Sequence, residues 1–199
     1  MDKTIGATIA LGYVIVAVTA LQGQQPAGDG PRYQSGNQLV RPANYREWPF
    51  LGAGLGLTYD ADPGPGAQNL PQNFSNVFVN PSSYRHFMQT GTWKDGTVFV
   101  LEIRASATGT APNTTGRYQT GMVALEAEVK DSKFPNGWAY FEFGRGTALR
   151  DAAEPLAGQR EAGCIDCHTK HTAVERTFVQ FYPHLLEVAK AKGTVKSGY

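Results

Sequence analysis

The chain is poor in cysteine, in net charge and in sequence repetition. Only two cysteines occur in 199 residues, Cys164 and Cys167, so none is left for a disulfide elsewhere. Lysine and arginine total 18 against 17 acidic residues, which gives a formal net charge of +1 and nothing that points to nucleic acid as a partner. No internal repeat is visible. With 41% apolar and 18% charged residues, the composition is that of an ordinary globular domain.

The two cysteines belong to one short motif. Residues 164–168 read Cys-Ile-Asp-Cys-His, the Cys-x-x-Cys-His pattern by which c-type haem is attached. In this pattern the thiols of Cys164 and Cys167 add across the haem vinyl groups, and His168 is an axial ligand of the iron. A helix here would place both cysteines on one face with His168 beside them. We therefore predict one covalently attached haem c.

Three other interpretations of the motif compete with haem attachment. Chance explains it poorly, because these are the only cysteines of the chain and a histidine follows directly. A thioredoxin-like redox pair should follow a strand, but residues 154–163 have no strand character. Zinc would need Cys164, Cys167, His168 and His171 as ligands from one helical stripe, which cannot close a tetrahedron around the metal. Haem is the favoured interpretation.

The only long apolar run stands at the N-terminus. Residues 5–21 carry no charge and follow Lys3. As a helix this run would be about 26 Å long, a little short of the ~30 Å hydrocarbon core of a bilayer. Residues 1–21 are therefore interpreted as a signal peptide with small residues at 18–20 for cleavage, and an uncleaved N-terminal membrane anchor is the alternative. Because c-type haem is attached outside the energy-transducing membrane, we expect a periplasmic or extracytoplasmic protein.

The first half of the remaining chain has mainly strand signals. Residues 22–37 are rich in Gln, Gly and Pro and predict a flexible linker, followed by a single domain over residues 38–199. Runs of strand-favouring residues beside turn residues predict strands over 76–80 and 97–103. Alternating apolar and polar residues predict strands over 121–129 and 137–143. A short helix is predicted over 82–90.

Beyond residue 146 the pattern becomes helical. We predict a short helix within 147–157, the motif helix over 162–170, and a helix over 171–192 that is bent or split at Pro183 and ends at Gly193. The fold class is α+β, a mainly antiparallel β-sheet with a C-terminal haem-binding helix and a following helix. Small class I cytochromes c and four-helix cytochromes c′ are helical throughout, so a motif that follows a β-rich stretch speaks against both.

Several separated segments together resemble the cytochrome P-460 family, which includes the cytochromes c′-beta. The likeness extends from about residue 39 to 192 and keeps the same order throughout. The segments that carry it are residues 44–48, 77–81 with Tyr84, 95–97, 125–133, 138–141, the haem motif and 178–183.

The resemblance implies a homodimer with one five-coordinate haem. His168 would be the proximal ligand, and the opposite face of the iron would stay open for a small nitrogenous ligand such as NO or hydroxylamine. Members that oxidise hydroxylamine bond a lysine covalently to the haem rim, in a strand reading Thr-Val-x-Val-Lys-Glu. Here residues 97–102 read Thr-Val-Phe-Val-Leu-Glu, so Leu101 stands at the cross-link position and has no nucleophile. This places the chain nearer to the c′-beta members.

Two further residues are candidates for the distal side of the haem. The resemblance aligns Glu126 with the family's distal glutamate, a proton relay, whereas strand alternation alone favours a solvent-facing carboxylate opposite the apolar face of Val123 and Leu125. Phe99 shares a strand face with Leu101 and is either part of a distal wall or ordinary sheet core.

Three functions follow from these observations. The leading one is an exported mono-haem protein with five-coordinate iron that binds NO or a related small molecule. The second is an oxidoreductase that converts hydroxylamine or NO, with Glu126 as proton relay. The third is a six-coordinate electron carrier whose second axial ligand is Met88, Met122, His86 or His184. The sequence does not identify a redox partner protein.

Overall fold

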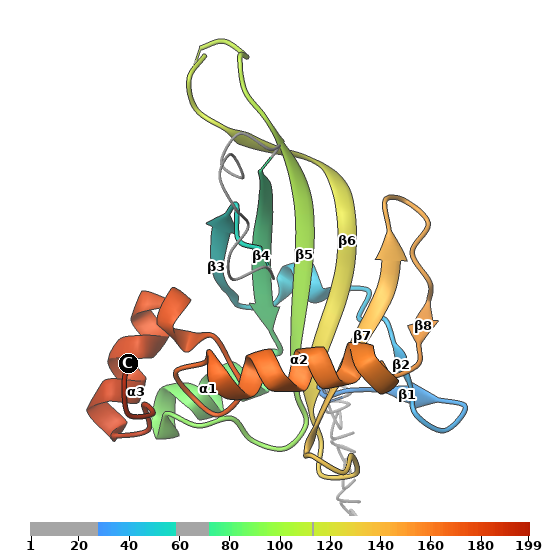
Figure 1. The fold of residues 1–199 in the computed structure, drawn as a ribbon, viewed down its shortest axis with the longest axis vertical. Coiled ribbons are helices and arrows are strands. Elements are labelled where there is room, and N and C mark those ends of the chain that lie inside the picture. Colours follow the sequence, from blue (N-terminus) through green and yellow to red (C-terminus); the bar gives the residue numbers. More distant parts are fainter. Residues whose placement is uncertain (1–27, 59–71, 113) are drawn as a thin grey trace, which may run out of the picture.

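A five-stranded antiparallel sheet forms the centre of the computed structural model, which describes residues 28–58, 72–112 and 114–199 (Figure 1). Each strand pairs with the next one along the chain, so the sheet is a meander. The four strands predicted from the sequence are confirmed, although their real bounds differ. The strands are β3 (Phe50–Leu55), β4 (Asn73–Val79), β5 (Thr97–Ala107), β6 (Tyr118–Lys130) and β7 (Trp138–Arg145).

A second, three-stranded sheet covers part of the first. It consists of β1 (Tyr33–Gln34), β2 (Gln38–Val40) and β8 (Ala152–Ala153). The predicted linker thus contains a strand, while its residues 22–27 and the predicted signal or anchor over 1–21 lie outside the described residues. The helix predicted within 147–157 is wrong. Ala153 pairs with Leu39 in the core, and Pro155 has no N–H for a helix.

Three α-helices accompany the sheets. They are α1 (Pro81–Thr90), α2 (Gly158–Lys170) and α3 (Pro183–Lys192). The predicted helix over 82–90 is confirmed, and the motif helix begins four residues earlier than its predicted start at 162. As predicted, α3 ends at Gly193, whose φ of 68° is the left-handed backbone that closes many helices. Among the described residues no helix is long and apolar enough to cross a membrane.

The helix predicted over 171–182 is also wrong. Only a 3-10 turn, η3 (Val179–Phe181), forms there. The hydroxyls of Thr172 and Thr177 donate to the backbone carbonyls of Glu175 and Val174, bonds that compete with helical ones. Glu175 has a φ of 49°, which no α-helix permits.

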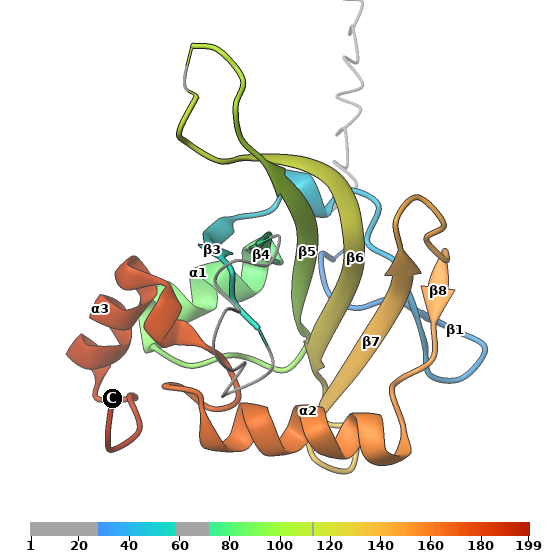
Figure 2. The ribbon, with the colours of Figure 1, turned by 45° about the horizontal axis from the view of Figure 1, so that its top comes forward.

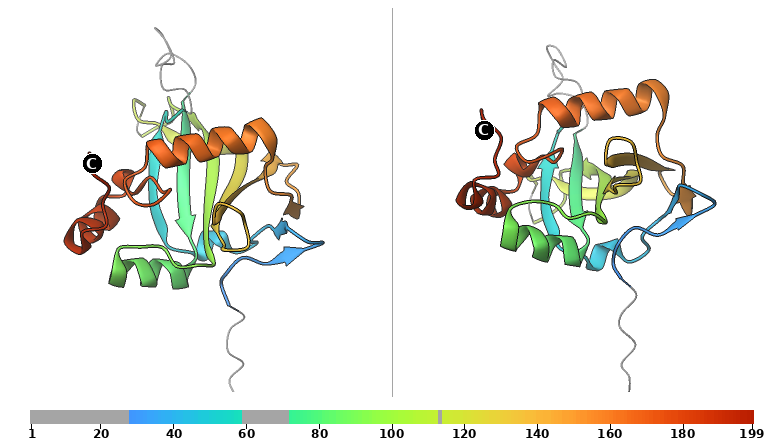
Figure 3. Two further views of the ribbon diagram at one scale, coloured as in Figure 1. Left: turned by 60° about the horizontal axis from the view of Figure 1, so that its bottom comes forward. Right: turned by 90° about the horizontal axis from the view of Figure 1, so that it is seen from below.

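The two faces of the central sheet pack against different parts of the chain. One face meets the small sheet and the 3-10 helix η1 (Tyr45–Glu47) through a cluster that includes Val100, Leu125 and Phe141. The other face meets α1, α3 and η3 through a cluster that includes Phe87 and Trp93. On that second face α2 runs crosswise to β5, β6 and β7 (Figures 2 and 3). The mainly antiparallel α+β fold is confirmed.

Glu102 is a buried carboxylate on the first face. Its side chain is 4% exposed, and it accepts hydrogen bonds from the Tyr45 hydroxyl, from Nε of Arg46 at 2.9 Å and from Nη1 of Arg104 at 2.8 Å. Burial alone would raise the pKa of Glu102. The hydrogen bonds and the two arginine charges outweigh burial, so this pKa lies below its ordinary value.

Replacing this carboxylate should destabilise the fold. Glu102→Gln leaves two arginines facing a neutral group, so we expect the free energy of unfolding to fall by about 3 kcal/mol. Because the pKa is depressed in the folded chain, this contribution is complete above the ordinary carboxyl pKa of 4.5 and is lost as pH falls through the lower folded pKa. Urea unfolding at neutral and acidic pH measures both effects.

The matched control is Asp151→Asn, which breaks the ion pair of Arg41 with a carboxylate that is 96% exposed. This variant should unfold like the parent. Equal stability of the Glu102→Gln and Asp151→Asn proteins at neutral pH would contradict a stabilising role for the buried cluster.

Candidate functional site

Helix α2 brings the three motif residues onto one face. Cys164, Cys167 and His168 are partly buried, whereas Ala162, Gly163 and Asp166 are exposed. The helix is supported locally by the pair of Lys170 with Asp166 at 2.6 Å, four residues apart. The predicted shared face of the cysteines and the histidine is therefore confirmed.

Both ends of α2 are fastened to the rest of the fold. Near the start, the Arg160 guanidinium binds the carboxylate of Glu142 on β7. This bond is the main reason why the pKa of Glu142 lies below its ordinary value. At the end, Nζ of Lys196 donates to the Thr169 carbonyl at 3.1 Å and to the Thr172 hydroxyl at 2.8 Å. The helix is thus held across the sheet by polar contacts at its two ends.

Helix α2 has only partly buried residues on its inner face. None of the 13 residues of this helix is buried, although it crosses a sheet. Both cysteines are free thiols. Burial raises the pKa of both, with the charge of Glu126 adding for Cys164 and that of Asp166 for Cys167, so neither thiol ionises readily. A helix that presents two partly buried thiols and a histidine on one face suits an apolar group bonded there.

His168 is held in a defined orientation on the sheet side of α2. Its side chain is 16% exposed, and its ring meets the rings of Tyr140 and Phe178 edge to face, with centroids 4.9 and 4.8 Å apart. Nδ1 lies 2.8 Å from the carbonyl oxygen of Arg176 and 3.1 Å from Oε1 of Glu128. Because Nδ1 faces two acceptors, it carries the hydrogen and leaves the lone pair on Nε2, as a metal-ligating histidine requires.

The surroundings of His168 also shift its pKa. Burial opposes protonation, but the neighbouring Glu128 carboxylate outweighs it and raises the pKa of His168. For Tyr140, burial and the Glu128 charge both raise the pKa, so the phenol stays neutral.

Strand register places the predicted distal residues beside one another. Leu101 on β5 pairs with Glu126 on β6, which pairs with Glu142 on β7. All three lie on the sheet face that α2 crosses, and the charge of Glu126 acts on both Cys164 and Arg160. Glu126 therefore lies near the motif helix on a covered face. Its role as a proton relay and the role of Leu101 stay predictions.

Phe99 lies two residues before Leu101, on the same face of β5. It is 5% exposed, and its ring packs edge to face on Trp93 with centroids 4.7 Å apart, so it forms part of the apolar core under α1 and α3. A contribution of Phe99 to a distal wall remains a prediction. Among the predicted sixth ligands, Met88 and His184 are exposed on α1 and α3.

Three residues around His168 were not predicted from the sequence. Glu128 is two positions after Glu126 on the same strand face, so alternation contained a signal for it. Tyr140 lies opposite Glu128 on β7, which only the strand register reveals. Arg176 belongs to a loop in a region predicted to be helical, and no sequence pattern pointed to its carbonyl.

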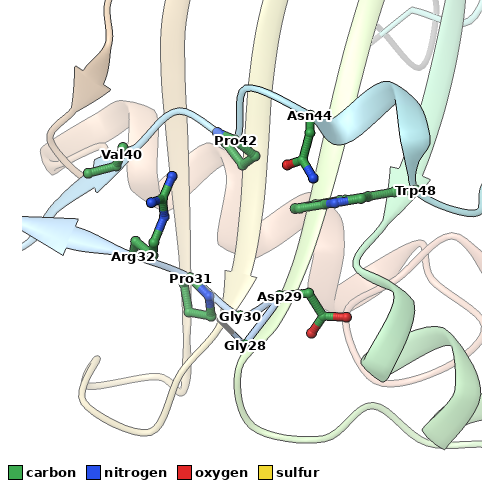
Figure 4. Close-up of a pocket in the computed structure, with 9 residues that line it drawn as sticks. All are labelled: Gly28, Asp29, Gly30, Pro31, Arg32, Val40, Pro42, Asn44 and Trp48. Carbon is green, nitrogen blue, oxygen red and sulfur yellow. The ribbon is translucent and has the colours of Figure 1, made fainter. Parts of the chain in front are cut away.

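A separate pocket of about 270 Å³ opens on the other side of the central sheet (Figure 4). It lies between the segment that leads into β1 and the segment that follows β2, with Arg32, Asn44 and Trp48 among its lining residues. Trp48 belongs to the apolar cluster on the face opposite α2. None of the motif residues or predicted distal residues lines this pocket.

The comparison with known protein families agrees with this geometry. A family model described as Cytochrome P460 matches residues 42–179, which is more than half of the chain and includes the whole of α2. The chain belongs to the cytochrome P460 family. Membership of the cytochrome P460 family makes this a haem-binding protein, and the resemblance found in the sequence is confirmed at that level. No curated protein matches the chain significantly.

The bond between Arg160 and Glu142 should stabilise the first turns of α2. In Arg160→Ala the first turns lose their tie to β7, and we expect their backbone amides to exchange about three- to fivefold faster with solvent deuterium. Lys170→Ala is the control, because it removes an exposed pair within the same helix and leaves the contact with β7 intact. Equal exchange in the first turns of both variants would show that Arg160 does not hold the helix.

Proposed function

We propose that this member of the cytochrome P460 family is an exported, homodimeric c-type mono-haem protein with five-coordinate iron. Its ligand is NO or a related small nitrogenous molecule, bound on the face of the iron opposite His168. The observation that carries the proposal is the geometry of α2. Two free thiols share one face with a histidine whose Nδ1 is engaged and whose Nε2 is left for iron. Export follows from the place where c-type haem is attached.

Each residue of the site then has a distinct task. Cys164 and Cys167 hold the haem by thioether bonds, and His168 binds the iron through Nε2. When bound, the haem supplies an iron centre with one open coordination position. Leu101 contributes an apolar surface that offers water no hydrogen bond, which favours small neutral ligands. Leucine also lacks a nucleophile for the haem cross-link of the hydroxylamine-oxidising members.

A second candidate function is conversion of hydroxylamine or NO. The observation that favours it is the position of Glu126, which pairs with Leu101 on the face crossed by α2. A carboxylate held there could give or take a proton as the bound molecule changes its charge.

The optical spectrum of the purified protein tests ligand binding. We expect one haem per chain that acid extraction does not remove, a high-spin ferrous spectrum, and a marked spectral change on adding NO. Cys164→Ser/Cys167→Ser should abolish the covalent mass increment, because no thiol remains to bond a vinyl group. A low-spin ferrous spectrum that ignores NO would instead establish a six-coordinate carrier. A haem–peptide mass showing an additional bond would overturn the argument from Leu101.

Glu126→Ala separates the binding protein from the enzyme. If Glu126 relays protons, this variant should lose hydroxylamine turnover while NO binding stays at the level of the parent. Glu187→Ala, which removes an exposed carboxylate on α3, is the control for the loss of charge. Equal turnover in the parent and in Glu126→Ala would exclude Glu126 as the proton relay.

A further inference from the structure

A cluster of buried polar groups lies beneath α2 around His168. Four buried side-chain atoms among the described residues have no well-aligned hydrogen bond, and three of them are Oε1 of Glu128, the Tyr140 hydroxyl and Nη1 of Arg176. Glu128 approaches Nδ1 of His168, and the Tyr140 ring packs on the His168 ring. The Tyr140 hydroxyl also interacts with Glu128 and Arg176, so these groups form one polar network beside the imidazole. Buried polar atoms without well-aligned partners are rare in native cores, and their concentration here calls for an explanation.

Two acceptors compete for the single hydrogen on Nδ1 of His168. The carbonyl oxygen of Arg176, at 2.8 Å, receives the well-aligned bond, and Oε1 of Glu128 lies at 3.1 Å. A carboxylate is a much stronger acceptor than an amide carbonyl, because the bond is assisted by charge. Both acceptors lie within 3.1 Å of the same nitrogen atom, so the hydrogen bond can pass from one to the other.

Both acceptors are held rigidly. Glu128 stands in the middle of β6, paired on both sides with Phe99 and Tyr140. The Arg176 carbonyl follows Glu175, whose left-handed backbone is a strained conformation for a residue other than glycine. The Glu175 carboxylate accepts from Nζ of Lys130 at 2.6 Å and from the Trp93 backbone N–H at 3.1 Å, and these contacts keep the loop in place.

We propose that Glu128 is a positioning residue for the axial ligand. With haem bound, its carboxylate accepts a hydrogen bond from the Nδ1–H of His168. This bond makes Nε2 a stronger electron-pair donor and so strengthens the bond from Nε2 to the iron. This inference rests on the proposed role of His168 as the iron ligand. A stronger proximal bond lowers the reduction potential and keeps His168 on the iron when NO binds to the opposite face.

The test uses the haem-loaded parent, Glu128→Gln and Asp166→Asn. Glutamine keeps the shape of Glu128 without its charge, and Asp166→Asn removes an equal charge from the exposed side of α2, two residues from His168. Haem content and magnetic circular dichroism first establish covalent haem with histidine ligation. If the parent itself lacks these, the proposed function fails before the role of Glu128 is tested.

Three readouts then report on the proximal bond itself. In Glu128→Gln we expect a lower iron–histidine stretching frequency in the resonance Raman spectrum, a higher midpoint potential, and a larger fraction of protein that loses His168 on binding NO. Asp166→Asn should match the parent in the stretching frequency and in histidine retention. A Glu128→Gln protein with full haem content and unchanged values in all three would overturn the proposal.

A second variant, Glu128→Asp, keeps the test possible if Glu128→Gln does not fold. Glu128→Asp keeps the charge but withdraws it by one methylene, so the three readouts should move in the same direction by smaller amounts. If Glu128→Gln takes up no haem, the aspartate variant carries the test, and values equal to those of the parent then overturn the proposal.

Discussion

The pairing register between β5 and β6 is the constraint on which the site depends. It sets Leu101 opposite Glu126 and Phe99 opposite Glu128, all on the face that α2 crosses. Because successive side chains of a strand point to opposite faces, a slip of β6 by one residue would turn Glu126 and Glu128 to the other face. A slip of β5 would instead turn Leu101 and Phe99 away and take Glu102 out of its arginine cluster. Two buried faces with different chemistry therefore specify one register.

Helix α2 is attached to this sheet in an unusual way for a central element. Its two ends are fastened by polar contacts, and none of its residues is buried. Burial of apolar surface is the usual source of helix stability in proteins, so here that contribution is largely missing from the polypeptide alone. A haem held at the inner face of α2 would add apolar contacts there.

Elements with local signals were predictable, and elements that depend on distant partners were not. Strand-favouring runs and alternation identified four strands of the central sheet, and Pro183 and Gly193 marked the limits of the last helix. The two-residue strand at Ala152 and Ala153 has no pattern of its own, because only pairing with β2 makes it a strand. The helical pattern after His171 misled, since threonine hydroxyls and the left-handed Glu175 take the chain out of the helix.

By itself the sequence determined the motif and its spacing. Because helix periodicity is local, Cys164, Cys167 and His168 share one face, and this arrangement predicts two thioether bonds and one axial ligand. Tertiary structure alone decided what acts on His168. Glu128 and the Arg176 carbonyl reach His168 from a strand and a loop that are far from each other in the chain, and only the strand register and the strained turn at Glu175 bring them to one nitrogen atom.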